Sequence, residues 1–198
     1  MMKAKTLAKA LCRAAIVTFF LGVSSCKNET KAEDPKEVAE DQNDAKFENN
    51  DDKADDSDFL VAAAESDLME IELGNLALTK GTSTQVKEFA KMLVADHTKS
   101  SAEMKPFAEK LQITLPAAIT EKGREKFEDL NDEKAGEDFD EKFSDMMVDN
   151  HNDAIDRMEK ASEDAHDPII KSWAAEKVVT LKSHLNHAKM LKDKVNNK

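Results

Sequence analysis

The chain has 198 residues, 35% of them charged, and it contains only 5 glycines, 4 prolines and no tyrosine. This composition favours helices, because helix breakers are few and strand formers are sparse. The formal net charge of -12 would repel a polyanion, so nucleic acid is not expected as a partner.

The N-terminus has the pattern of a bacterial lipoprotein signal peptide over residues 1–25. Basic residues precede a short apolar run from Ala14 to Val23. This run is about half of the ~20 residues that a membrane span needs. It ends in Val23-Ser24-Ser25-Cys26, which resembles a lipobox. We therefore expect acylation of Cys26, with palmitate-type chains, and an ordinary secretory signal with an incidental cysteine is the alternative.

An acylated Cys26 places the protein in the cell envelope, anchored by lipid to a membrane, and the outer membrane is the expected one. The membrane is then the expected partner, and no feature indicates a protein partner. The other cysteine, Cys12, lies in the segment that the signal peptidase would remove. No thiol would remain for a disulfide, a metal site or a nucleophile.

Residues 26–56 predict a disordered acidic tether. Acidic residues outnumber lysines here, and Val38 and Phe47 are the large apolar residues. Such a segment buries too little apolar surface to offset the entropy lost on ordering. Its acidic start resembles surface-export signals of some Gram-negative lipoproteins, and a plain solvated spacer is the simpler interpretation.

Helical periodicity begins at Ser57 and continues to residue 196. The first helix, which ends at Lys80-Gly81, is expected to bury one stripe: Val61, Ala64, Leu68, Ile71, Asn75 and Leu78. A second helix follows Thr82, and Pro106 predicts a kink or a break in it near Lys105. A weaker helix spans about 120–134, a long one carries Phe139 to Ala161, and the last begins at Asp167-Pro168. Four long helices with short connections predict an all-α, antiparallel four-helix bundle with an additional short helix.

Three histidines lie on the inward stripes of these helices. Two segments share the order Phe, Met, Val, His and contain His97 and His151, while His184 lies on the last helix. Bundle cores build metal sites from inward Glu and His residues, so these three residues, with Glu72, form a candidate metal site. The nearby Met92, Met146 and Met147 would suit copper, or one Met and one His could ligate haem.

Two observations limit this chemistry. A di-iron centre needs two Glu-x-x-His pairs, whereas Val94, Val148 and Leu181 stand three residues before the inward histidines. The alternative is a buried polar network in which Asp96, Asn75, Asn150 or Ser100 supply hydrogen-bond partners. No nucleophile elbow or phosphate-binding glycine loop is present, so no catalytic residue is identified and enzymatic activity is not indicated.

The stretch from Ala62 to Ala77 resembles the first-helix pattern of the family called domain of unknown function 4142. The two Phe–His segments and Leu181-Lys182-Ser183-His184-Leu185 resemble its other three motifs, in the same order, over about residues 57–193. The resemblance implies a ferritin-like bundle outside the cytoplasm, often described as an outer-membrane protein and without an established activity. The matching positions are Glu72, His97, His151 and His184.

The sequence thus predicts a lipoprotein with a signal peptide (1–25), a tether (26–56) and a ferritin-like bundle (57–196). The leading interpretation is a binding or structural protein of the envelope, related to stress, that needs no cofactor. The alternative is an envelope protein that binds a metal ion or haem through its inward histidines.

Overall fold

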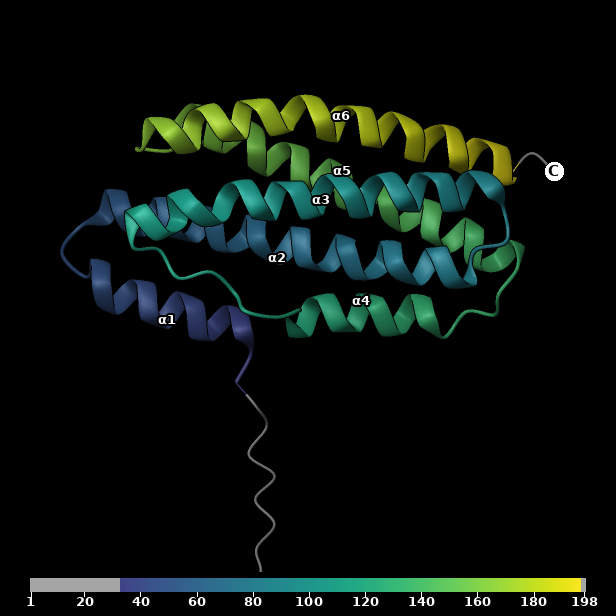
Figure 1. The fold of residues 1–198 in the computed structure, drawn as a ribbon, viewed down its shortest axis with the longest axis horizontal. Helices are drawn as coiled ribbons and strands as arrows, with labels where there is room; N and C mark the ends of the chain where they lie inside the picture. Colours follow the sequence, from purple (N-terminus) through teal and green to yellow (C-terminus); the bar gives the residue numbers. More distant parts are fainter. Residues whose placement is uncertain (1–32, 197–198) are drawn as a thin grey trace, which may run out of the picture. The chain divides into compact units, whose positions relative to one another are not determined.

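The computed structural model describes residues 33–196, and every regular element within that range is a helix. The helices are α1 (Pro35–Phe47), α2 (Asp51–Lys80), α3 (Thr84–Leu111), α4 (Glu121–Asn131), α5 (Glu137–Asp164) and α6 (Pro168–Asn196) (Figure 1). Four are long and form the bundle, while α1 and α4 are short and lie beside it. The predicted all-α bundle is confirmed, with two short helices rather than one.

Two aspartates show which helix ends meet. Asp140, near the start of α5, accepts hydrogen bonds from the backbone N–H groups of Thr82 and Ser83 at the start of α3, at 3.1 and 2.8 Å. Asp56, near the start of α2, accepts from the backbone N–H of His166 just before α6, at 2.8 Å. The helix pairs α3/α5 and α2/α6 are therefore each parallel. The segment containing α4 crosses the length of the bundle, so that connection is not short as predicted, and the topology is ferritin-like (Figure 1).

Pro106 does not interrupt α3, which continues to Leu111. Proline removes one backbone donor and leaves the carbonyl of Ala102 without its usual partner. Both residues are exposed, so water can satisfy that carbonyl. Of the predicted kink or break near Lys105, the break does not occur.

The helix α1 lies inside the segment that was predicted to be disordered. Asp34 caps it by accepting from the Lys36 backbone at 2.7 Å, and Pro35 occupies the first turn. Asn43 is fully buried and exchanges two hydrogen bonds with the backbone of Thr114, at 2.9 and 2.7 Å. Buried hydrogen bonds thus hold a helix that has few apolar residues. The tether prediction is wrong for residues 35–56, where α1 and the first turn of α2 are folded.

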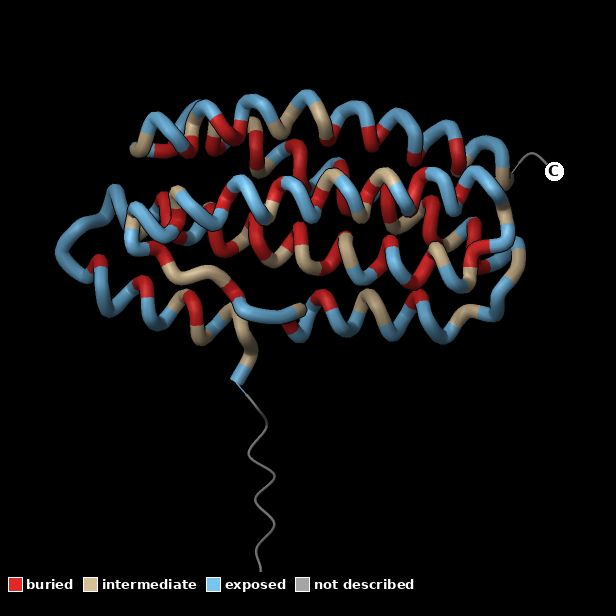
Figure 2. The backbone as a smooth tube through the Cα atoms, viewed as in Figure 1, coloured by how far each residue is buried: buried red, intermediate tan, exposed pale blue. Residues whose placement is uncertain are grey.

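Buried residues recur along the whole length of the long helices (Figure 2). The apolar ones form two clusters, one toward each end of the bundle. One contains Leu60, Met104 and Trp173, and the other contains Leu73 and Phe143. Between them along the helices lies a layer of buried polar side chains: Asp67, Glu70, His97, Asn150, His151 and His184. We call these six residues the polar layer.

Residues 1–32 lie outside the described part of the chain. The signal peptide, the acylation of Cys26 and the first part of the tether therefore stay predictions. Within residues 33–196, no helix is both long and apolar enough to cross a membrane.

Candidate metal centre

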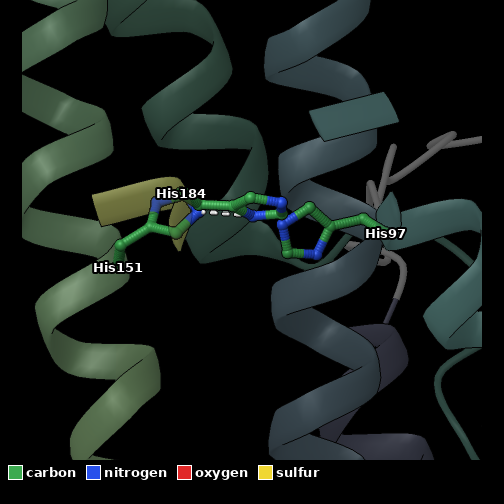
Figure 3. Close-up of side chains that lie close together, drawn as sticks. All are labelled: His97, His151 and His184. Carbon is green, nitrogen blue, oxygen red and sulfur yellow. Dashed lines mark hydrogen bonds between the residues drawn. The ribbon is translucent and has the colours of Figure 1, made fainter. Parts of the chain in front are cut away.

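The polar layer brings together one histidine from each of three helices. His97 comes from α3, His151 from α5 and His184 from α6, and their exposed fractions are 4%, 1% and 1%. The three rings point toward one another (Figure 3). One nitrogen from each lies within 4.8 Å of the other two. The three inward histidines that the sequence indicated therefore converge on one point in the core.

His151 and His184 make the closest approach. His151 Nε2 lies 3.3 Å from His184 Nδ1, and the two ring centroids are 5.3 Å apart. Two nitrogen ligands bound ~2.0–2.1 Å from one ion at a tetrahedral angle would lie about 3.3–3.4 Å apart. The observed separation thus fits a pair of ligands on a single ion. The His97 ring completes the group, with its centroid 5.9 Å from that of His151 and 5.6 Å from that of His184.

The other nitrogen of each ring has an acceptor that fixes its proton. His97 Nδ1 donates to Asp67 Oδ1 at 2.8 Å, His151 Nδ1 donates to the Met147 carbonyl at 2.8 Å, and His184 Nε2 donates to Asp96 Oδ2 at 2.8 Å. Carboxylates and carbonyls only accept, so these ring nitrogens must carry hydrogen.

In the neutral rings, the inward nitrogens are therefore bare acceptors. His151 Nε2 and His184 Nδ1 face each other without a hydrogen to share, and His97 Nε2 is buried without a hydrogen-bond partner. A carboxylate or carbonyl behind each ring is also the arrangement that orients histidine ligands of metals.

The pKa values of the three imidazoles shift in different directions. Burial lowers the pKa of His184 to about 4, against the opposing effect of Asp96. Burial also lowers the pKa of His151, and the nearby His97 adds to this effect. For His97, burial is the largest influence and acts downward, but the hydrogen bond and charge of Asp67, with the charges of Glu70 and Asp96, raise its pKa overall. At neutral pH, His151 and His184 are thus uncharged and able to ligate a metal.

Glu70 adds a buried carboxylate to the layer. It is 2% exposed, its Oε1 accepts from Asn150 Nδ2 at 2.8 Å, and its Oε2 has no hydrogen-bond partner. Asn150 Oδ1 in turn accepts from Lys126, which is half-buried. The charge of Glu70 contributes to the raised pKa of His97 and partly opposes the lowering of the pKa of His151 by burial. The layer therefore places negative charge around the three inward imidazole nitrogens, which favours a bound cation.

A small cavity of about 30 Å³ adjoins His97 and His184. Its polar lining includes Asp96, Ser100 and Thr180. This volume has room for about one to a few water molecules. A porphyrin would need far more space, since sites for ligands of drug size occupy roughly 300–1,000 Å³. The haem alternative therefore finds no support at these histidines.

The structure brings together three of the four metal ligands that were predicted from the sequence. His97, His151 and His184 come together, but Glu72 is exposed and stands outside the group, so its assignment to the site is wrong. The stripe predicted for α2 lies about one residue around the helix from the face that is buried in the structure. The prediction therefore placed Glu72 near the core, whereas Glu70 is the buried glutamate.

The surrounding side chains also differ from expectation. Asn75 is exposed, and Asn150 bonds Glu70 rather than a histidine, whereas Asp96 does bond His184 as anticipated. Met92 is only partly buried and lines a separate surface cavity, so it does not accompany the three histidines.

Sequence reasoning missed Asp67 and Glu70, which are buried at 5% and 2% exposure. The available signal was the small residues on the same face of α2, above all Ala63, Gly74 and Ala77. A Cβ on Gly74 would lie 2.7 Å from Val94 Cγ2, so α3 packs very closely here. Small residues at helical spacing indicate close helix packing, and polar residues among them then lie inside.

Comparison with solved structures finds the same architecture elsewhere. A chain described as "CopM in the Cu(II)-bound form" is similar with a TM-score of 0.60 at 16% sequence identity. The likeness covers 70% of this chain and 96% of that chain, and at this identity it concerns the fold. A search of curated proteins finds no match.

Residues 39–191 match a protein family described as "Domain of unknown function (DUF4142)". This range contains all of the polar layer and begins within α1, so it includes the later part of that helix. The match extends the resemblance found in the four sequence motifs to most of the chain. The protein belongs to the DUF4142 family.

Proposed function

We propose that this protein is a metal-binding protein of the cell envelope, which holds one transition-metal ion on His97, His151 and His184. The observation that carries the proposal is the meeting of three buried imidazole nitrogens that have no hydrogen to share. In a purely structural network, one of the facing nitrogens would be expected to donate to the other. Here the outer nitrogens hold those hydrogens.

Copper is the first ion to test. Three imidazoles without a thiolate suit copper, zinc, iron or nickel. The similar solved structure was obtained with Cu(II) bound, and this directs the choice to copper without deciding it. Zinc is the second candidate, because the cavity beside His97 and His184 has room for the water that completes a tetrahedral site of three histidines.

Binding or storage agrees better with the site than catalysis does. The adjoining cavity of about 30 Å³ admits water but no substrate of ordinary size. The buried ligands and their carboxylate partners favour retention of an ion. We therefore place the protein among metal-handling proteins of the envelope.

The location rests on the N-terminal sequence. The lipobox-like Val23-Ser24-Ser25-Cys26 supports a lipid anchor, and the outer membrane is the proposed site of attachment. Replacing Cys26 with Ala should release the protein from membranes to the soluble fraction. Retention of the Cys26→Ala variant in washed membranes would contradict the anchor and leave the metal proposal untouched.

The metal proposal is tested by elemental analysis of protein purified without chelator, followed by titration of the metal-free protein with Cu²⁺ and Zn²⁺. We expect one equivalent of ion at the histidines and a higher melting temperature on binding, since an ion that binds only the native state stabilises it. The His97→Ala/His151→Ala variant should lose this ion.

His166→Ala is the matched control, because His166 is an exposed histidine outside the polar layer. It should bind the ion as the unmodified protein does. If neither ion binds stoichiometrically, or if the double variant binds as well as the control, the buried polar network is the correct interpretation.

A further inference from the structure

A second group of metal-ligating side chains lies at the surface between α3 and α6. A cavity of about 340 Å³ is lined there by Met92 from α3 and by His187 and Met190 from α6. None of these three residues belongs to the polar layer. Phe89, also from α3, lines this cavity as well.

The His187 ring is held with one nitrogen available. Its Nδ1 donates to the Ser183 carbonyl at 2.9 Å, which leaves Nε2 as the free acceptor. The ring is also stacked on Phe89, with centroids 6.3 Å apart and planes inclined by 19°. These two contacts limit the rotation of an otherwise exposed side chain, as is required of a preorganised ligand.

Two thioethers accompany this imidazole. Met190 is three residues after His187 on α6, and Met92 is three residues after Phe89 on α3, so each pair lies on one helix face. Met190 is 63% exposed, although a methionine of a bundle usually fills the core. A large, exposed apolar side chain that lines a cavity together with a free imidazole nitrogen is better explained by ligation than by packing.

We propose that Met92, His187 and Met190 form an outer binding site for Cu⁺. Thioether ligands are soft and select monovalent copper over zinc and over harder ions. Two residues of opposite charge, Glu88 and Lys194, also line the cavity, so the net charge around the three proposed ligands is close to zero. A neutral set of soft ligands suits a soft monovalent ion.

Phe89 connects this outer site with the polar layer. Its ring centroid is 6.3 Å from that of His187 and 6.4 Å from that of His151. One aromatic ring thus lies between His187 and His151 of the polar layer.

The first test uses Ag⁺, a redox-stable substitute for Cu⁺, and protein labelled with ¹³C at the methionine methyl groups. Addition of one equivalent should shift the methyl signals of Met92 and Met190 in NMR spectra. The signals of the buried Met69 and Met104, which line neither this cavity nor the one beside His97 and His184, should stay in place. If the Met92 and Met190 signals do not move, the outer site does not exist.

The second test measures Cu⁺ affinity of the metal-free protein without oxygen, in competition with a chromophoric chelator. The Met92→Leu/Met190→Leu variant preserves side-chain volume, and it should lose one class of Cu⁺ site or weaken it at least tenfold. Met146→Leu, a half-buried methionine outside the cavity, is the matched control and should bind normally. Equal Cu⁺ binding by both variants would overturn the proposal.

This site does not depend on the inner one. In the His97→Ala/His151→Ala variant, the Ag⁺-induced shifts of Met92 and Met190 should persist, which would support the outer site alone. Loss of those shifts in this variant, with its helical content unchanged, would contradict an independent outer site. Failure of the inner site and failure of the outer site therefore give different results.

Discussion

His97 Nδ1 lies 2.8 Å from Asp67 Oδ1, and this hydrogen bond joins α3 to α2 inside the polar layer. Asp67 also accepts from Ser101 at 3.3 Å, so the carboxylate is fixed on both sides. The bond holds the proton on Nδ1 and turns the unpartnered Nε2 toward the other two histidines. The position of one acidic residue thus determines which nitrogen of His97 can bind an ion.

Replacing Asp67 with Asn should weaken metal binding about 10- to 100-fold, which is the usual effect of removing a carboxylate behind a histidine ligand. The amide keeps the shape and one acceptor but loses the charge. Titration of the metal-free variant with Cu²⁺ and Zn²⁺ measures the effect. Glu72→Gln on the same helix is the matched control, because Glu72 is exposed and outside the group. Equal weakening in both variants would show a general effect of charge rather than orientation of His97.

Replacing Glu70 with Gln should reduce the stabilisation that a bound ion gives. One oxygen of the buried Glu70 carboxylate has no hydrogen-bond partner, so the unpaired charge destabilises the metal-free protein. A bound cation would remove that destabilisation. The difference between metal-bound and metal-free melting curves should shrink by an amount on the order of 1 kcal/mol or more. The metal-free Glu70→Gln protein itself should be at least as stable as the unmodified one. A variant that loses stability equally with and without the ion would show that Glu70 acts only through Asn150.

The metal-free protein should become less stable as the pH falls from about 6.5 toward 4. Burial lowers the pKa of His184 to about 4 and also lowers that of His151, whereas both regain ordinary values on unfolding. The unfolded state then binds more protons in this window, so the free energy of unfolding decreases with acidification.

His97 acts in the opposite sense. Its raised pKa adds stability that is complete below about 6.5 and is lost at higher pH, so its contribution is constant within the window. Urea unfolding at several pH values measures the net effect, to which His184 contributes up to about 3 kcal/mol. His184→Gln should flatten the dependence, and an unchanged slope in that variant would contradict the role of His184.

Replacing Gly74 with Ala should destabilise the bundle, although alanine is the better helix former by roughly 0.5–1 kcal/mol. The added Cβ would meet Val94 Cγ2 at 2.7 Å and the Ala90 carbonyl at 3.2 Å. Overpacking of this kind usually costs about 1–3 kcal/mol. Chemical denaturation gives the value. Adding Val94→Ala should restore part of the loss by removing the closer contact, and no recovery in the double variant would place the strain elsewhere.

Much of the fold could be predicted, because it follows from apolar periodicity. The long helices, the start at Asp167-Pro168 and the inward position of three histidines all depend on spacing along a single helix. The helix α1 begins with the same kind of start signal, Asp34-Pro35, but few large apolar residues follow it, so apolar periodicity did not indicate a helix there. It is held by Asn43 and the backbone of Thr114, 71 residues apart, and such a pair leaves no local pattern.

The candidate site was predictable only in part, for a related reason. The histidines stand on apolar stripes, so their inward direction was visible in the sequence. Asp67 and Glu70 stand on a face of α2 made of small residues, whereas the large apolar side chains of the helix indicate a neighbouring face as the buried one. The choice of Glu72 instead of Glu70 came from this displacement. The convergence of the rings depends on helix pairing, which periodicity does not contain.

The six residues of the polar layer lie at one height along the bundle, and this affects the register of the helices. All six polar side chains lie between two apolar clusters, so the four long helices have one alignment that keeps them together. A slip of one helix by one turn, about 5.4 Å, would move an imidazole or a carboxylate among Leu and Phe side chains. Burying such a group without a partner costs several kcal/mol, so slipped arrangements are strongly disfavoured. The same residues that offer an ion its ligands thereby fix how the helices align lengthwise.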